Sequence, residues 1–366
     1  MSSRLTQYLR LFDQEHPLVL ENGARLAPVE AAYETYGRLN PGGDNAVLVC
    51  HALTGSAHVA GDLAGDPGWW EPMIGPGRPL DTDRFFVVCT NFLGGCYGTT
   101  GPSSADPRTQ LPYGLRFPAV SVRDMVTVQH TLLRRLGVSR LATVIGGSLG
   151  GMQVLEWAAM FPAMVASIIP IATAVAHSPW CIGLNELSRQ AIMNDPAWLQ
   201  GSYSTDRQPE QGLSLARQIA MISYRSDISF MQRFHRDTVA PATGCTLQDQ
   251  LRVSYQVERY LRYQGTKLVR RFDANTYLSI TRSMDGHDLA RGRGVMKDVL
   301  GGIAVPSLCV GIDSDILYPA HEQREIAAAL PRASYTEIHS PHGHDAFLIE
   351  YASLGTAVSA FLRDLV

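Results

Sequence analysis

The amino-acid sequence predicts an α/β protein with a mostly parallel sheet, and three observations support this fold class. Short apolar runs bounded by turn or polar residues are typical of strands that are buried on both faces of a sheet. Helical patterns with recognisable ends separate these runs towards both ends of the chain. The length of 366 residues, of which 45% are hydrophobic and 18% charged, suits one large core with an insertion, or two domains.

Six segments carry the strand pattern. They are residues 46–50 (AVLVC), 85–91 (FFVVCTN), 141–147 (LATVIGG), 166–172 (ASIIPIA), 307–313 (SLCVGID) and 334–339 (SYTEIH).

Capping residues indicate where the helices begin and end. In the segment 121–138, Ser121 is expected to cap the first turn and Gly137 to end the helix. The segment 319–330 begins with a proline, which suits the first position of a helix. In the segment 354–365, apolar residues recur at helical spacing.

The middle of the chain follows a different pattern. Helical patterns cover residues 213–225, 247–265 and 275–286. No convincing strand run accompanies them, so the simplest explanation is a helical insertion between two strands of one sheet. We therefore expect a core domain of residues 1–174 and 301–366 and a helical lid domain of residues 175–300.

Charge and cysteine patterns narrow the classes of partner. The net charge is −3 without a run of lysine or arginine, which disfavours nucleic acid and membrane surfaces and leaves small-molecule substrates. No apolar signal segment opens the chain, and no uncharged apolar stretch reaches about 18 residues, so we expect a cytoplasmic protein. The six cysteines form no C-x-x-C pair and are interpreted as small apolar residues.

A serine among glycines is the strongest functional signal. In the segment 144–157 (VIGGSLGGMQVLEW), Gly146, Ser148 and Gly150 form a G-x-S-x-G pattern between a predicted strand and a predicted helix. In such a nucleophile elbow, a strained serine projects its hydroxyl at the edge of the sheet, and its neighbours in space must lack Cβ atoms. A Gly-rich packing turn and a phosphate-cradling loop are the alternatives, although the G-x-x-x-x-G-K-[ST] pattern is missing.

A nucleophilic serine needs a general base and a carboxylate that orients this base. With this type of elbow, the order along the chain is serine, acid, histidine. The loops after the last two predicted strands offer Asp313, Asp315, His339, His342 and His344. We favour His344 as the base because a flexible glycine precedes it and apolar residues follow it. The order of residues does not separate the two aspartates, and the histidine spacing fits no metal motif.

Two backbone amides are expected to stabilise an oxyanion. One belongs to Leu149, directly after the serine. The other belongs to the loop after residues 46–50, where we favour Leu53. His51 and His58 in this region lack the spacing of metal ligands and are interpreted as structural, so no metal is expected.

Five segments taken together resemble the homoserine O-acetyltransferase family of the α/β-hydrolase superfamily. They are HALTGSAHVAG (51–61), NFLGGCYGTTGPSS (91–104), GGSLGGMQVLEW (146–157), SDILYP (314–319) and GHDAFL (343–348). The similarity extends over nearly the whole chain. It implies an α/β-hydrolase fold with a helical lid, a homodimer paired through the lid, and acetyl-CoA as a co-substrate without any cofactor. One departure is Leu149, where many members carry methionine, a swap that conserves volume.

The resemblance also implies a role for individual residues. The implied catalytic residues are Ser148 as nucleophile, Asp315 as acid and His344 as base. The implied acceptor-binding residues are Arg217 for the carboxylate of homoserine, Tyr224 close by, and Asp345 for the ammonium. An arginine fork suits bidentate binding of a carboxylate.

The implied reaction is a two-step acetyl transfer from acetyl-CoA to the hydroxyl of L-homoserine, an entry step to methionine. The nearest alternatives use succinyl-CoA as donor or serine as acceptor, since one pocket side chain could decide either. An esterase or thioesterase with the same triad and a non-catalytic binding scaffold are more distant alternatives.

Overall fold

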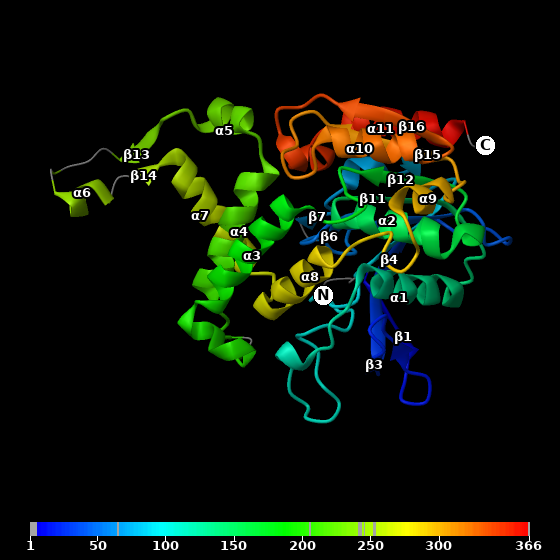
Figure 1. The fold of residues 1–366 in the computed structure, drawn as a ribbon, viewed down its shortest axis with the longest axis horizontal. Helices are drawn as coiled ribbons and strands as arrows, with labels where there is room; N and C mark the ends of the chain where they lie inside the picture. Colours follow the sequence, from blue (N-terminus) through cyan, green and yellow to red (C-terminus); the bar gives the residue numbers. More distant parts are fainter. Residues whose placement is uncertain are drawn as a thin grey trace.

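An eight-stranded sheet forms the centre of the protein (Figure 1). In spatial order its strands are β1 (Gln7–Phe12), β4 (Val29–Tyr36), β10 (Phe86–Thr90), β5 (Ala46–Cys50), β11 (Leu141–Gly147), β12 (Ile168–Ile171), β15 (Ser307–Ile312) and β16 (Ala333–Ile338). β4 pairs antiparallel with β1 and with β10, and the other neighbours are parallel. The predicted α/β class with a mostly parallel sheet is confirmed.

The computed structural model describes residues 6–63, 66–204, 206–240, 244, 246–251 and 254–364. Cys245, residues 1–5 and 365–366 of the expected core domain, and residues 252–253 of the expected helical segment 247–265 lie outside these residues. The other five cysteines are free thiols.

All six predicted strands are present, each within two residues of the expected bounds. The antiparallel strands β1 and β4 were not predicted. In β1 the polar Gln7 and Arg10 are exposed and only Leu11 is fully buried, and in β4 the fully buried Glu34 interrupts the apolar pattern. Between β1 and β10, short strands also pair outside the sheet: β2 (Leu18–Val19) with β3 (Arg25–Leu26), β6 (Asp62–Leu63) with β7 (Asp66–Pro67), and β8 (Ile74–Gly75) with β9 (Leu80–Asp81).

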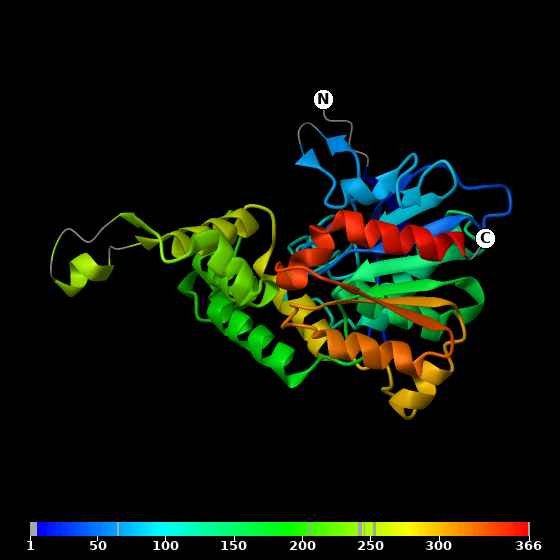
Figure 2. The same cartoon turned by 90° about the horizontal axis from the view of Figure 1, so that it is seen from above.

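Helices cover both faces of the sheet (Figure 2). On one face, Leu354 and Val358 of α11 (Tyr351–Arg363) share an apolar cluster with Val47 and Val49 of β5. The helices of the other face are α1 (Val122–Arg135), α2 (Leu149–Met160), α9 (Met296–Gly301) and α10 (Ala320–Ala329). Successive side chains of a strand point to opposite faces, which explains why the parallel strands read as continuous apolar runs.

The predicted ends of α1 are confirmed. The Ser121 hydroxyl accepts a hydrogen bond from the amide of Asp124, whose carboxylate accepts one from the Ser121 amide. This reciprocal pair is a capping box. Gly137 follows the helix with φ of +85°, a conformation that favours glycine.

Between β12 and β15 the chain leaves the sheet and forms a helical body that projects from one end of the core (Figures 1 and 2). Its helices are α3 (Pro179–Met193), α4 (Glu210–Tyr224), α5 (Asp227–Phe234), α6 (Leu247–Leu251), α7 (Gln256–Val269) and α8 (Ala274–Asp285). α4 packs against α3 and α7, and α8 packs against α3. Two short strands in this region were not identified from the sequence. β13 (Thr238–Ala240) and β14 (Ser254–Tyr255) pair antiparallel, but both are too short to give a recognisable run.

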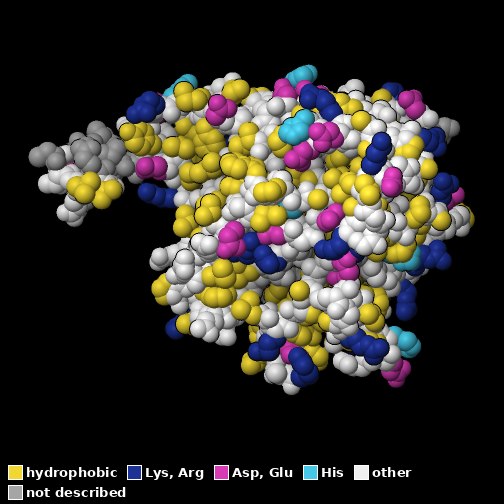
Figure 3. Space-filling view, in the orientation of Figure 1, with side chains coloured by type: hydrophobic (Ala, Val, Ile, Leu, Met, Phe, Trp, Pro, Cys, Tyr) yellow, Lys and Arg dark blue, Asp and Glu magenta, His cyan; other side chains and the backbone are white. Residues whose placement is uncertain are grey.

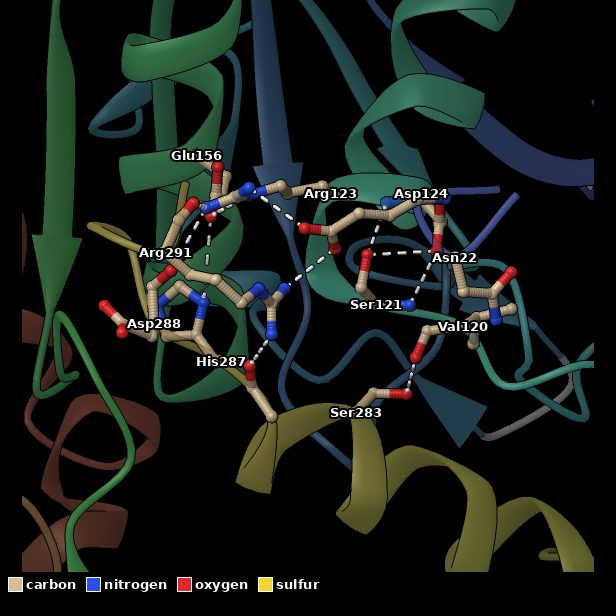
Figure 4. A network of polar contacts seen from close by, with 12 residues as sticks. Asn22, Val120, Ser121, Arg123, Asp124, Glu156, Ser283, His287, Asp288 and Arg291 are labelled. Carbon is tan, nitrogen blue, oxygen red and sulfur yellow. Dashed lines mark hydrogen bonds and ion pairs between the residues drawn. The ribbon is translucent and has the colours of Figure 1, made fainter. Parts of the chain in front are cut away.

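A network of ion pairs fastens the end of this helical body to the core (Figure 4). Arg123 of α1 contacts Glu156 of α2 at 3.1 Å and Glu21 at 2.9 Å. Arg291 and Arg293, which follow α8, contact Glu21 at 2.8 Å and Glu156 at 2.7 Å. The Glu156 side chain is buried, and a buried ion pair that loses one partner is strongly destabilising. The network therefore ties α1, α2 and the returning chain together.

None of the helices in the described ranges is both long and apolar enough to cross a membrane.

Candidate active site

Ser148 occupies the sharp turn between β11 and α2. Its φ of +59° and ψ of −126° are unusual for a residue with a Cβ atom, and such a backbone conformation costs about 1–3 kcal/mol. The Ser148 amide donates to the carbonyl of Ile171 at 3.0 Å, and the Thr173 hydroxyl donates to the Ser148 carbonyl at 2.7 Å. Both partners belong to the end of β12 and the residues after it, so the neighbouring strand holds the serine in its strained conformation.

The glycines around Ser148 allow close approaches that a side chain would prevent. A Cβ atom on Gly150 would lie 2.1 Å from the carbonyl oxygen of Cys50, at the end of the adjacent strand β5. A Cβ atom on Gly147 would lie 2.6 Å from the Phe347 ring, in the segment that carries the predicted base. The glycine-rich sequence is therefore explained by the packing of the elbow against two other chain segments.

His344 and Asp315 form a buried pair. The Nδ1 atom of His344 lies 2.7 Å from Oδ2 of Asp315, and each residue is 4% exposed. The Oδ1 atom of Asp315 accepts hydrogen bonds from the amides of Leu317 and Tyr318 at 2.8 and 3.0 Å. Since a carboxylate only accepts hydrogen bonds, His344 donates from Nδ1, which leaves Nε2 as the basic nitrogen.

The loops after β11, β15 and β16 bring the three residues to one region. Ser148 lines a pocket together with Tyr224 and Tyr318. The rings of these tyrosines lie 5.8 and 5.2 Å from the His344 ring between centroids. Phe347, which packs against Gly147 of the elbow, lies 5.4 Å from the same imidazole. The serine and the imidazole thus share their immediate neighbours.

The structure separates the two candidate aspartates, which the order of residues had left open. Asp313 contacts His339 at 3.0 Å, and the side chains of both residues are more than one third exposed. Asp315 contacts His344 instead, on the buried side of the loop. Among the described residues, no group of three or more His, Cys, Asp or Glu side chains is arranged to hold a metal ion.

The expected oxyanion amides lie beyond the ends of adjacent strands, Leu53 in the loop after β5 and Leu149 at the first residue of α2. β5 and β11 pair in parallel, with Cys50 opposite Gly146, so Leu53 and Leu149 follow neighbouring strand ends. Within the described parts of the chain, neither amide donates a hydrogen bond. Arg271 of the helical body donates from Nη1 to the carbonyl of Thr54 at 2.7 Å, which fastens the loop that carries Leu53.

The predicted acceptor-binding residues come from both the helical body and the core: Arg217 and Tyr224 from α4, and Asp345 from the segment after β16. The guanidinium carbon of Arg217, on α4, lies 5.4 Å from the centre of the Tyr224 ring. Asp345 is contacted by Nε of Arg225 at 3.2 Å. Burial raises the pKa of the Asp345 carboxyl, and the nearby charges of Arg225 and Arg217 partly oppose this effect. α4 therefore brings positive charge to the segment that carries the imidazole.

Sequence reasoning did not identify several polar residues of this region. Arg225 directly follows Tyr224, and this adjacency was its only signal. His177, Asn185 and Tyr318 line the pocket with Ser148. Tyr318 lies within the SDILYP segment but had no predicted role, and His177 and Asn185 lie in a region where no helix end had been identified.

Comparison with known proteins agrees with this geometry. The model of the α/β hydrolase fold family matches residues 45–351. A homoserine O-acetyltransferase of Carboxydothermus hydrogenoformans is 50% identical over 353 residues, which cover 94% of this chain and 93% of that protein. The homoserine O-acetyltransferase of Symbiobacterium thermophilum is 52% identical over 370 residues, which cover 99% of this chain and 96% of that protein.

Solved structures show the same similarity. The homoserine O-acetyltransferase of Bacillus anthracis superposes with a TM-score of 0.91 at 27% identity, with 98% of each chain covered. The esterase E22 superposes with a TM-score of 0.89, also at 27% identity, with 98% of this chain and 99% of that chain covered. Identity near 50% over almost the full length is the stronger relation, and on this ground the chain belongs to the homoserine O-acetyltransferase family of the α/β-hydrolase fold.

Proposed function

We propose that the protein transfers the acetyl group of acetyl-CoA to the side-chain hydroxyl of L-homoserine, which yields O-acetyl-L-homoserine and coenzyme A. The observation that carries this proposal is the buried Asp315–His344 pair beside a serine in a strained elbow, in a chain about half identical to homoserine O-acetyltransferases. The product places the reaction in methionine biosynthesis.

In the first half-reaction, Ser148 is the nucleophile. Nε2 of His344 takes the proton of the Ser148 hydroxyl, and the oxygen attacks the thioester carbon. The amides of Leu53 and Leu149 stabilise the oxyanion, which accounts for their unpaired state. The carbon–sulfur bond then breaks, and the coenzyme A thiolate leaves with the proton from His344. Asp315 keeps the imidazole in the required tautomer.

In the second half-reaction, homoserine replaces coenzyme A. Arg217 binds its carboxylate and Asp345 its ammonium, with Tyr224 alongside. His344 takes the proton of the homoserine hydroxyl, whose oxygen attacks the acetyl carbon, and Ser148 leaves with that proton. Two charged contacts at fixed positions hold the hydroxyl near the base, which lowers the entropic cost of the reaction.

Residues 175–300 are assigned to a lid domain over the core of residues 1–174 and 301–366, although α9 at the end of this range packs on the core. The position of Arg217 on α4, next to the Tyr224 ring that flanks His344, supports this division. A lid that closes over the acyl-enzyme excludes water and so favours transfer over hydrolysis.

The experiment that tests the proposed activity compares donors and acceptors. Purified protein is assayed for coenzyme A release with acetyl-CoA or succinyl-CoA, each with homoserine, serine or no acceptor. The proposal expects the highest kcat/KM for acetyl-CoA with homoserine. Equal release without any acceptor would instead assign hydrolysis, the activity named for the structurally similar esterase E22.

We also propose that two chains form a homodimer through the lid. Exposed apolar side chains gather on this part of the chain (Figure 3), and such clustering marks interaction surfaces. They include Trp180, Leu187, Leu215, Ile222, Ile228, Met231 and Tyr263. Ile228→Glu with Met231→Glu on α5 is expected to yield monomers in sedimentation analysis. Leu111→Glu, at an exposed position of the core, is expected to leave the dimer intact.

A cytoplasmic location completes the proposal. The five described cysteines are unpaired, as is usual where thiols are kept reduced, and acetyl-CoA is the proposed donor. Homoserine and acetyl-CoA are the only small molecules required.

A further inference from the structure

Beside the candidate catalytic residues, a carboxylate, an imidazole and a hydroxyl group form a second row of hydrogen-bonded side chains, here called the His177 relay. Nδ1 of His177 lies 3.1 Å from Oδ1 of Asp285, and Nε2 of His177 lies 3.0 Å from the Tyr318 hydroxyl. His177 lies two residues before the start of α3, Asp285 is the last residue of α8, and Tyr318 lies in the loop after β15. All three side chains are buried. The proposed mechanism assigns no role to any of them.

The contacts of Asp285 determine which groups donate and which accept in the hydrogen bonds of the His177 relay. Asn185 donates to Oδ1 at 2.8 Å, and Nη1 of Arg189 lies 2.7 Å from Oδ2. Burial alone would raise the pKa of the Asp285 carboxyl, but the hydrogen bonds from His177 and Asn185 and the charge of Arg189 together lower it. The ionised carboxylate accepts the Nδ1 proton of His177, and Nε2 then accepts the proton of the Tyr318 hydroxyl.

Tyr318 connects the His177 relay to the candidate catalytic pair of Asp315 and His344. Its amide donates to Asp315 at 3.0 Å, and its ring centre lies 5.2 Å from that of His344. Tyr318 and His177 line the same pocket as Ser148. Because the phenol proton points to His177, the lone pairs of the Tyr318 oxygen remain available as acceptors beside the base.

The chemistry of the two substrates indicates which of them uses this acceptor. An amino acid with a hydroxyl group brings several N–H and O–H donors to the pocket. The reacting end of an acetyl thioester brings none. We propose that His177 and Asp285 are positioning residues that hold the Tyr318 oxygen as a hydrogen-bond acceptor for the incoming amino acid. This inference rests on the proposed acetyl transfer, and it assigns the His177 relay to the second half-reaction of that transfer.

The test separates the two half-reactions of the full-length protein. The acylation rate is measured as the rapid release of coenzyme A from acetyl-CoA without acceptor. The deacylation rate is measured as the loss of the acetyl group from the protein at increasing homoserine concentration. Tyr318→Phe removes only the hydroxyl and is expected to leave the acylation rate within about 2-fold. It should weaken the use of homoserine about 10-fold or more, as for the loss of a buried hydrogen bond.

Further variants distinguish positioning from a general loss of structure. His177→Ala should reproduce the selective defect, and His177→Gln should restore part of the homoserine dependence because its amide can still accept the phenol proton. Tyr335→Phe, which removes the hydroxyl that contacts Glu337 at the edge strand β16, is the matched control and should leave both steps unchanged.

Two results would overturn the inference while leaving the proposed function intact: an equal fall of both rates in Tyr318→Phe, or no change in either. If the unaltered protein takes up no acetyl group from acetyl-CoA, the proposed function fails and the inference fails with it.

Discussion

Nδ1 of His344 lies 2.7 Å from Oδ2 of Asp315, and the second oxygen of this carboxylate is held by two backbone amides. The carboxylate is therefore fixed before it orients the imidazole. Asp315→Asn retains the shape of the side chain but can present an N–H group to Nδ1, which favours the wrong tautomer. We expect kcat for acetyl transfer to fall about 10⁴-fold with little change in thermal stability, as for the equivalent change in serine proteases. A fall of less than about 10-fold would contradict the assigned role.

Charge reversal at Arg217 distinguishes transfer from hydrolysis. Arg217→Glu places a carboxylate where the proposed function has homoserine bind its own carboxylate. We expect the kcat/KM for homoserine to fall at least about 100-fold, since a charge-assisted contact is replaced by repulsion. Hydrolysis of a small acetyl ester, which lacks a carboxylate, should change little. Parallel loss of both activities would show that Arg217 acts on the fold rather than on the acceptor.

A methyl group at position 147 is expected to destabilise the protein. Its Cβ atom would lie 2.6 Å from the buried Phe347 ring, and overpacking of a core costs about 1–3 kcal/mol. Gly147→Ala should therefore lower the free energy of unfolding in urea by this amount. Gly183→Ala is the matched control, because its Cβ atom would have no neighbour within 4 Å on the exposed side of α3, and it should stabilise by about 0.5–1 kcal/mol. Equal effects of the two changes would refute the packing argument.

Because the His287 side chain is buried in its neutral form, we predict that the free energy of unfolding decreases in mild acid. Burial lowers the pKa of His287 to about 3, with positive charges on Arg291 and Arg123 acting in the same direction. In the unfolded chain this pKa is about 6.5, so the unfolded state binds a proton that the folded state excludes. The contribution of His287 to stability is therefore full above about pH 6.5 and decreases as the pH falls, by up to about 1.4 kcal/mol per unit.

Urea unfolding at pH 7, 6 and 5 measures this effect. In His287→Gln the free energy of unfolding should depend less steeply on pH than in the unaltered protein. His16→Gln, at a side chain that is 84% exposed, should leave the slope unchanged. Identical slopes in all three proteins would show that His287 gains a proton in the folded state as readily as in the unfolded one.

Local sequence signals were sufficient where one segment determines the structure. The elbow at Ser148 needs glycines on both sides within a few residues, and the parallel strands need continuous apolar runs. The antiparallel strand β4 carries the buried Glu34, which is satisfied by Thr6, Tyr36 and His58. Two of these partners, Thr6 and His58, come from other segments, so the pattern of β4 alone did not identify it.

Pairings between distant segments could not be predicted from the sequence. His177 and Asp285 are 108 positions apart, and neither lies in a recognisable motif. The contact between Arg225 and Asp345 depends on how α4 packs against the segment after β16. Asp315 could be preferred over Asp313 only by resemblance. The structure separates them because one faces the buried imidazole and the other an exposed histidine.

The central claim is that Ser148 becomes covalently acetylated and passes the acetyl group to an amino acid. The most direct measurement is the mass of the protein after brief incubation with acetyl-CoA alone, followed by peptide mapping and by addition of L-homoserine. We predict one acetyl group per chain on the peptide that contains Ser148, its rapid removal by homoserine, and no adduct in Ser148→Ala. Acetyl transfer to homoserine by Ser148→Ala at the rate of the unaltered protein, or an adduct that homoserine does not discharge, would contradict the account.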